Sequence, residues 1–161
     1  MLPGSLSRLQ HPKGGLVGVL ELCDTPAASV SLEATAADAV RLMLDRHVGA
    51  VAVVDSEKRV AGIFTERDVL IKLSLSQRNL DTTPVRDVMT TPVELASSET
   101  TPGEALTTMV DRHFRHLPVA DFNGKLLGML SIRDLLQWRI DDLGQELDSL
   151  EQYVSNDGPG G

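Results

Sequence analysis

Two seven-residue motifs combine residue types that could bind a mononucleotide. They run from Gly62 to Asp68 and from Gly128 to Asp134, and each holds a hydroxyl residue, an arginine and an aspartate at equivalent positions. A hydroxyl residue followed three positions later by an acid is typical of a helix start, where backbone N–H groups and the helix dipole attract phosphate. The hydroxyl and the arginine would donate to a phosphate, and the aspartate could accept hydrogen bonds from a ribose diol.

The same motif also has a purely structural interpretation. Ser/Thr-x-x-Asp is close to a capping box, in which the hydroxyl caps the helix and the acid accepts a hydrogen bond from the backbone of the cap residue. Capping does not require the arginine that precedes each aspartate, Arg67 and Arg133. The presence of this arginine in both motifs therefore favours a binding site.

The motifs belong to an internal repeat with a period of 66 residues. A shift by one period aligns identical residues, among them Thr25-Pro26 with Thr91-Pro92, Asp45-Arg46-His47 with Asp111-Arg112-His113, and Gly62 with Gly128. The chain therefore contains the same structural unit twice.

Each copy predicts the order strand, helix, strand, strand, helix. In the first copy we expect a short strand at 30–32, a helix from Thr35 and a hairpin of strands at 50–54 and 60–64. In the second copy the corresponding segments are 93–95, 102–113, 117–120 and 126–130. Each motif then begins the last helix of its copy.

One copy is only about 60 residues long and would bury a marginal core on its own. We therefore expect a mixed α/β (α+β) fold, in which two β-α-β-β-α repeats pack sheet face against sheet face with pseudo-two-fold symmetry. This packing leaves two equivalent clefts between the repeats.

The repeat, both motifs and the paired segments 50–55 and 116–121 resemble a tandem pair of cystathionine-β-synthase (CBS) domains, the Bateman module. The resemblance covers roughly residues 17–140. It implies that an adenine nucleotide, AMP first among the candidates, binds as a regulatory ligand in the clefts, and that no cofactor is required. It also implies that the aspartate binds the ribose and the hydroxyl binds the phosphate.

The resemblance divides the chain into six parts. We expect a flexible N-terminus at 1–16, CBS domain 1 at 17–76, a linker at 77–84, CBS domain 2 at 85–140, a C-terminal helix extension at 141–155 and a disordered tail at 156–161. The first 15 residues contain basic residues and no acid, so a weak organelle signal is the alternative to a frayed terminus.

Carried over residue by residue, the family pattern assigns nucleotide-binding residues to both clefts: Thr65, Arg67 and Asp68 to one, and Ser131, Arg133 and Asp134 to the other. Family members often contact phosphate just before the central strand, where copy two has Arg115 and His116 but copy one has Gly49 and Ala50. We therefore expect the Ser131 cleft to be the tighter site. Copy one would close it with backbone around Ala28, Val48 and Gly49.

The histidines and the cysteine carry weaker signals. His113 and His116 have a metal-like spacing, but no nearby Cys or third His supports it, so we expect neither a metal nor a catalytic histidine. Cys23 is the only cysteine, which excludes an intrachain disulfide and a cysteine-rich zinc site. We expect it to be a small buried apolar residue in a cytoplasmic protein.

The last helix carries an apolar stripe with spacings of 4, 3, 4, 3 and 4 residues: Leu136, Ile140, Leu143, Leu147, Leu150 and Val154. Such a stripe fits a partner helix. We favour a homodimer contact through the modules and this helix, with packing onto its own module as the alternative.

The net charge is −8, which disfavours a nucleic-acid polymer as partner. Residues 141–161 hold six of the acids and no Lys or Arg, so residues 1–140 carry only −2 and could bind a single nucleotide. No apolar stretch approaches the roughly 20 residues of a membrane span.

An enzyme is the least favoured class, because the sequence shows no paired base and nucleophile, metal cluster or P-loop. The sequence predicts a regulatory sensor of AMP, ADP, ATP or an NAD-type ligand, acting through homodimer geometry on an unidentified partner protein. The alternative is a structural or protein-interaction CBS module with degenerate clefts.

Overall fold

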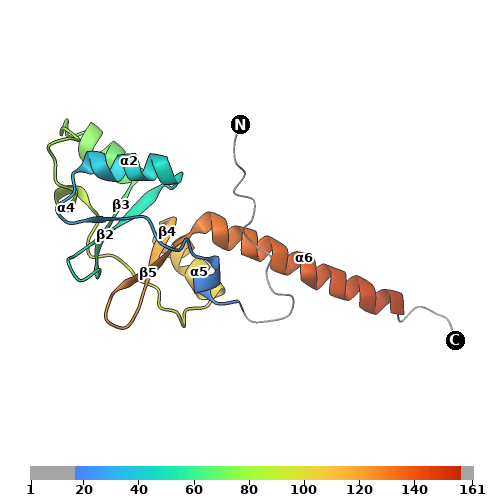
Figure 1. Ribbon diagram of the computed structural model, residues 1–161. Helices are drawn as coiled ribbons and strands as arrows, with labels where there is room; N and C mark the ends of the chain where they lie inside the picture. The colour runs from blue at the N-terminus through green and yellow to red at the C-terminus, as the bar shows by residue number, and fades with distance from the viewer. Residues whose placement is uncertain (1–16, 157–161) are drawn as a thin grey trace.

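The computed structural model describes residues 17–156 of the 161-residue chain (Figure 1). The first repeat contains β1 (Ser29–Ser31), α2 (Ala36–Arg46), β2 (Ala50–Val54), β3 (Val60–Thr65), α3 (Glu66–Asp68) and η1 (Val69–Ser74), a π-helical turn. The second contains α5 (Pro102–Arg112), β4 (His116–Ala120), β5 (Leu126–Ser131) and α6 (Ile132–Asn156). Two short helices, α1 (Val19–Leu22) and α4 (Val85–Val88), precede the repeats.

The mixed α/β fold is confirmed. The first repeat has the expected order of strand, helix, strand, strand and helix, whereas the second begins with its helix α5. The expected N-terminus at 1–16 and residues 157–161 of the expected tail lie outside the described residues. Asn156, assigned to that tail, is the last residue of α6.

The long helices of the two repeats begin and end in the same way. Thr35 before α2 and Thr101 before α5 each form a complete capping box with the acid three residues later. Both helices end at a histidine in the left-handed conformation, with φ of 53° at His47 and 59° at His113. The two histidines, which are equivalent in the repeat, therefore occupy the same position at the ends of equivalent helices.

The two repeats differ in their sheets. In the first, β1 pairs parallel with β2 and β2 pairs antiparallel with β3, whereas the second has only the antiparallel pair β4–β5 among the described residues. The predicted strand at 93–95 is wrong, since only Ala96 bridges to Val119. In the first repeat the N–H of Ala52 donates to Ala28 O, but its equivalent is Pro118, which has no N–H. The parallel ladder therefore cannot extend from Ala96 back to residue 94, so no strand forms at 93–95.

The repeats pack through their sheets. A shared core cluster joins Ala50, Ala52, Val54 and Ile63 of the first repeat to Met129 of the second. Strand β2 contacts β5, and β3 contacts β4. Strands β2 and β3 of the first repeat are equivalent to β4 and β5 of the second. A pseudo-two-fold axis therefore converts the β2–β5 contact into the β3–β4 contact, as expected.

Each repeat also receives a short helix from outside its own boundaries. Val19 and Leu22 of α1 lie in the core of the second repeat, and Val85 and Val88 of α4 lie in the core of the first. Helix α1, blue in Figure 1, contacts β5 and α6. The expected domains 17–76 and 85–140 therefore each contain a helix that packs into the other repeat.

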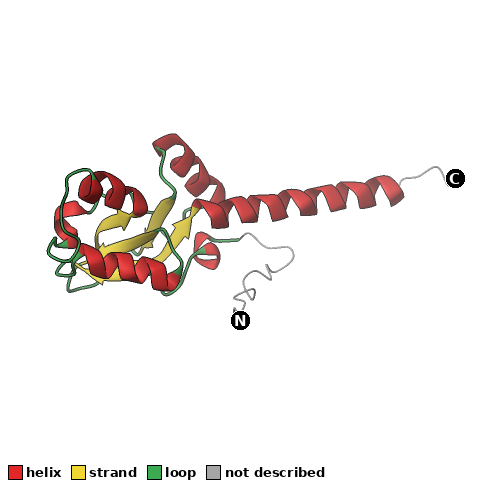
Figure 2. Cartoon of the chain, turned by 90° about the horizontal axis from the view of Figure 1, so that it is seen from above, coloured by secondary structure: helices red, strands yellow, loops and turns green. Residues whose placement is uncertain are grey.

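Helix α6 begins against the second repeat and then projects away from it (Figure 2). Leu135 in its first turns is fully buried, and Trp138 packs against the same core. Among residues 17–156, no helix is both long enough and apolar enough to cross a membrane.

Candidate functional site

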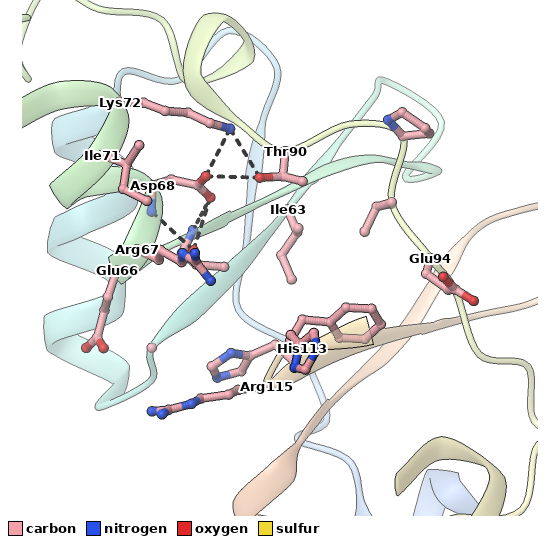
Figure 3. Close-up of a pocket in the computed structure, with 16 residues that line it drawn as sticks. Ile63, Glu66, Arg67, Asp68, Ile71, Lys72, Thr90, Glu94, His113 and Arg115 are labelled. Atoms are coloured by element: carbon pink, nitrogen blue, oxygen red, sulfur yellow. Dashed lines mark hydrogen bonds and ion pairs between the residues drawn. The ribbon is translucent and has the colours of Figure 1, made fainter. Parts of the chain in front are cut away.

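A cavity of about 630 Å³ lies between the two repeats (Figure 3). Its size is within the range of small-molecule sites. The first repeat and the segment that follows it supply Gly49, Ile63, Thr65, Glu66, Arg67, Asp68, Ile71, Lys72, Thr90, Pro92, Val93 and Glu94. The second repeat supplies His113, Phe114, Arg115 and His116.

Asp68 is the best-positioned acceptor in this cavity. The residue is only 6% exposed, and its Oδ2 accepts from the Thr65 backbone N–H at 2.9 Å and the Thr65 hydroxyl at 3.1 Å. Oδ1 accepts from the Thr90 hydroxyl and from Lys72 Nζ, both at 2.9 Å. The capping box is therefore present, and both carboxylate oxygens have donors. A ribose diol would have to replace the donors on Oδ1.

Lys72 and Thr90 are site residues that the motif did not reveal. Lys72 lies four residues after Asp68 on η1, and its ammonium also donates to Thr90 Oγ1 at 3.2 Å, as Figure 3 shows. It donates to Met89 O at 3.1 Å as well. The four-residue spacing of Asp68 and Lys72 was a signal for this ion pair. Thr90 comes from the segment before the second repeat, so sequence spacing gave no indication of its contact with Asp68.

The second repeat contributes basic side chains to the same cavity. Arg115 extends toward α3 from the opposite side, as Figure 3 shows. His116 is half-buried, and the absence of a side chain at Gly49 makes room for it, since a Cβ there would lie 3.3 Å from His116 Cε1. Burial lowers the pKa of His116, although the charges of Glu66 and Asp134 oppose this effect.

The structure places two residues that were expected in the Ser131 cleft against the first motif. Arg115 and His116 line the cavity that contains Thr65, Arg67 and Asp68, and His116 also pairs with Ser131 in the β4–β5 ladder. The physical reason is the pseudo-two-fold packing, which places β4 against β3, so that the segment leading into β4 faces the motif of the other repeat.

The remaining predicted site residues are not among the described residues that line this cavity: Ser131, Arg133, Asp134, Ala28 and Val48. The Ser131 hydroxyl donates to Asp134 Oδ2 at 2.8 Å and accepts from the Asp134 N–H at 3.2 Å, so this motif also caps its helix. Ala28 is 4% exposed in the core of the first repeat, and Val48 packs against that core. Ala28, Val48 and Gly49 were expected to close the Ser131 cleft. Of these three, only Gly49 lines this cavity, which contains Asp68.

The two aspartate motifs differ in the segment that pairs with the strand before them. Asp24 exchanges backbone hydrogen bonds with Met129, as Thr90 does with Ile63, so an acid occupies the place of Thr90 in this repeat. Burial and the charges of Asp134 and Asp24 raise the pKa of the Cys23 thiol to about 12. The Asp68 carboxylate thus contacts the Thr90 hydroxyl and the Lys72 ammonium, whereas the position equivalent to Thr90 holds an acid in the second motif's site.

Comparison with known proteins agrees with the repeat and the packing. The sequence matches the family model for the CBS domain twice, at residues 14–75 and 85–141. The chain belongs to the CBS domain family. CBS domains are generally regulatory, and the matches indicate no enzyme family.

Relatives of this CBS-domain chain include an uncharacterised 17.7 kDa protein of Acidianus ambivalens, 38% identical over 76% of this chain and 73% of the relative. A protein of Methanopyrus kandleri, 35% identical over 75% of this chain, is matched over 62% of its own length. A solved structure of a CBS-domain protein from Burkholderia ambifaria has a TM-score of 0.71, 33% identity and coverage of 78% of this chain and 96% of its own.

A CBS domain protein from Pyrobaculum aerophilum, solved in complex with AMP, has a TM-score of 0.67 and 27% identity, covering 73% of this chain and 89% of its own. The fold is thus one on which a nucleotide complex has been observed.

Proposed function

We propose that this CBS pair is a regulatory module that binds a phosphate-bearing adenine nucleotide, with AMP the first candidate, in the cavity at Asp68. The observation that carries the proposal is the meeting of two kinds of group in one cavity of about 630 Å³. The first repeat supplies a buried carboxylate, and the second supplies Arg115 and His116. The AMP complex of the Pyrobaculum relative supports the choice of ligand class.

The lining suggests how the ligand would be held. The ribose hydroxyls would donate to Asp68 and release Lys72 and Thr90, and the phosphate would accept from Arg67 and Arg115, which are both exposed. Adenine would pack against aliphatic side chains such as Ile63 and Ile71. Such a ligand would contact both repeats and would favour the arrangement in which they close around it.

The regulatory output belongs to the same proposal. A ligand that binds two arrangements of the repeats with different affinity shifts their populations, and a homodimer could pass this shift to a partner protein. We place the protein in the cytoplasm, where adenine nucleotides are available to be sensed. Without a ligand, the chain would instead be a structural CBS module.

Isothermal titration calorimetry with AMP, ADP, ATP, NADH and adenosine tests the proposal. We expect at least one phosphate-bearing nucleotide to bind, and Arg115→Ala to weaken it at least about tenfold, because a charge-assisted hydrogen bond is lost. Adenosine, which has no phosphate, should bind equally to both proteins. The matched control is Arg78→Ala, which removes an exposed arginine outside the cavity.

Binding of no nucleotide would overturn the ligand proposal and leave the structural alternative. Equal effects of Arg115→Ala and Arg78→Ala would place the phosphate elsewhere. A thermal shift provides a second measurement, because a ligand at one hundred times its Kd stabilises the folded state by about 2.7 kcal/mol.

A further inference from the structure

The outer part of α6 carries an apolar stripe that no described part of the chain covers. The six residues are between 43% and 70% exposed: Leu136, Ile140, Leu143, Leu147, Leu150 and Val154. Alternating spacings of four and three residues keep them on one side of the helix. Figure 2 shows the helix extending away from both repeats, so the stripe is accessible along its length.

The stripe fits a second copy of the same helix. Alternate spacings of three and four define the two core positions of a coiled coil, and a 25-residue helix extends over about 37 Å. The spacing pattern reads the same in both directions around residue 145, so a second copy could lie parallel or antiparallel. Apolar contacts alone do not choose between the two.

Charged residues beside the stripe decide the direction. In a parallel pair the flanking positions bring Glu146 of each helix against Glu151 of the second copy, which creates two repulsive contacts. In an antiparallel pair Arg139 meets Tyr153 of the second copy and Gln137 meets Glu151, and one repulsive contact remains between the two Glu146 side chains.

The charge distribution along the whole helix favours the same direction. Residues 132–140 hold two arginines and one aspartate, whereas residues 141–156 hold five acids and no basic residue. Antiparallel packing lays the basic part of one helix beside the acidic part of the other, and it also pairs opposite helix dipoles.

We propose that two copies of this chain associate through α6 as an antiparallel helix pair centred near residue 145. Leu136 then packs against Val154 of the second copy, Ile140 against Leu150, and Leu143 against Leu147. The proposal specifies the dimer of the proposed function, but it requires no nucleotide.

This geometry has a consequence for the second repeat. The end of each helix lies beside the first turns of the other α6, which contain Asp134. The two CBS pairs lie at opposite ends of the helix pair. A change at either Asp134 motif would therefore reach the end of the partner helix.

Cysteine pairing distinguishes the two directions. In a Cys23→Ala background, an Ile140→Cys protein and an isotope-labelled Leu150→Cys protein are mixed and oxidised. An antiparallel pair gives the mixed 140–150 disulfide. Two copies of the Leu150→Cys protein form little disulfide with each other, because their substituted positions lie about 15 Å apart along the axis. A dominant 150–150 disulfide would show a parallel pair and overturn the proposal.

Light scattering tests whether the helix is the interface, with no nucleotide present. Leu147→Asp should convert the dimer to a monomer, while Gln145→Asp adds the same charge to the opposite side of the helix and should leave the dimer intact. A monomeric unmodified protein, or a dimer unaffected by Leu147→Asp, would refute the proposal. These results leave the nucleotide titration unaffected, so each proposal can fail separately.

Discussion

Gly128 in the second motif is required by packing, and replacing it with alanine should destabilise the protein. A Cβ at this position would lie 2.7 Å from Cys23 Cβ and 3.3 Å from Asp24 O. Carbon atoms in contact normally lie about 3.5–4.0 Å apart, so one segment must move by about 1 Å. Both neighbouring atoms are on or next to the backbone, which excludes relief by a rotation of a side chain.

The expected cost follows from this overlap. Overpacking of a filled core costs about 1–3 kcal/mol, and displacement of the 23–24 segment also weakens its two hydrogen bonds to Met129, of 3.0 and 3.3 Å. We expect Gly128→Ala to lower the free energy of unfolding by about 2 kcal/mol. Gly103→Ala is the matched control, because nothing lies within 4 Å of its Cβ. In helix α5 this control should stabilise by about 0.5–1 kcal/mol.

Urea unfolding measures both changes. Trp138 is the only tryptophan and packs against the core of the second repeat, so its fluorescence reports on this region. Far-UV circular dichroism of the same samples checks that unfolding is two-state.

A double-mutant cycle identifies the atom responsible. Cys23→Gly removes the contacting Cβ and should recover at least about 1 kcal/mol of the loss in Gly128→Ala, whereas Cys23→Ala keeps that Cβ and should recover little. The reasoning is refuted if Gly128→Ala changes stability by less than about 0.5 kcal/mol. Equal rescue by both Cys23 variants would refute it as well.

Two further predictions concern titratable groups. Burial lowers the pKa of His116, so the unfolded chain binds its proton at a higher pH than the folded protein. The free energy of unfolding should therefore fall as the pH drops below about 6.5. In urea titrations over the same pH range, the free energy of unfolding of the His116→Gln protein should fall less. Equal pH dependence of the two proteins would contradict this. The Cys23 pKa rises from 9.0 to about 12, which lowers the thiolate fraction about a thousandfold. At pH 8, the Cys23 thiol of the folded protein should react with a disulfide reagent about a thousandfold more slowly than the thiol of the urea-unfolded chain. Equal rates in the two states would contradict the burial of Cys23.

Local rules in the sequence determined much of the fold. The 66-residue period predicted two copies of one unit, and each hydroxyl-x-x-acid motif marked a helix start, because both depend on neighbouring residues. Thr35, Thr65 and Thr101 form capping boxes as these rules require. The stripe on α6 also followed from spacing alone.

Contacts between distant segments were decided by the tertiary structure. Thr90 donates to Asp68 across 22 residues, and Arg115 joins the cavity of the first motif. The strand expected at 93–95 is missing because the residue of β4 that would donate a backbone hydrogen bond to it is Pro118, which has no N–H.

The sequence by itself therefore determined the family, the repeated unit and the residue types of the proposed nucleotide site. Only the tertiary structure decided which basic residues face which aspartate. The repeat is nearly symmetric in sequence, and the pseudo-two-fold axis brings the start of β4 against the end of β3. The spacing of residues within one repeat cannot predict this contact between repeats, because the position of the axis depends on how the surfaces of the two repeats pack.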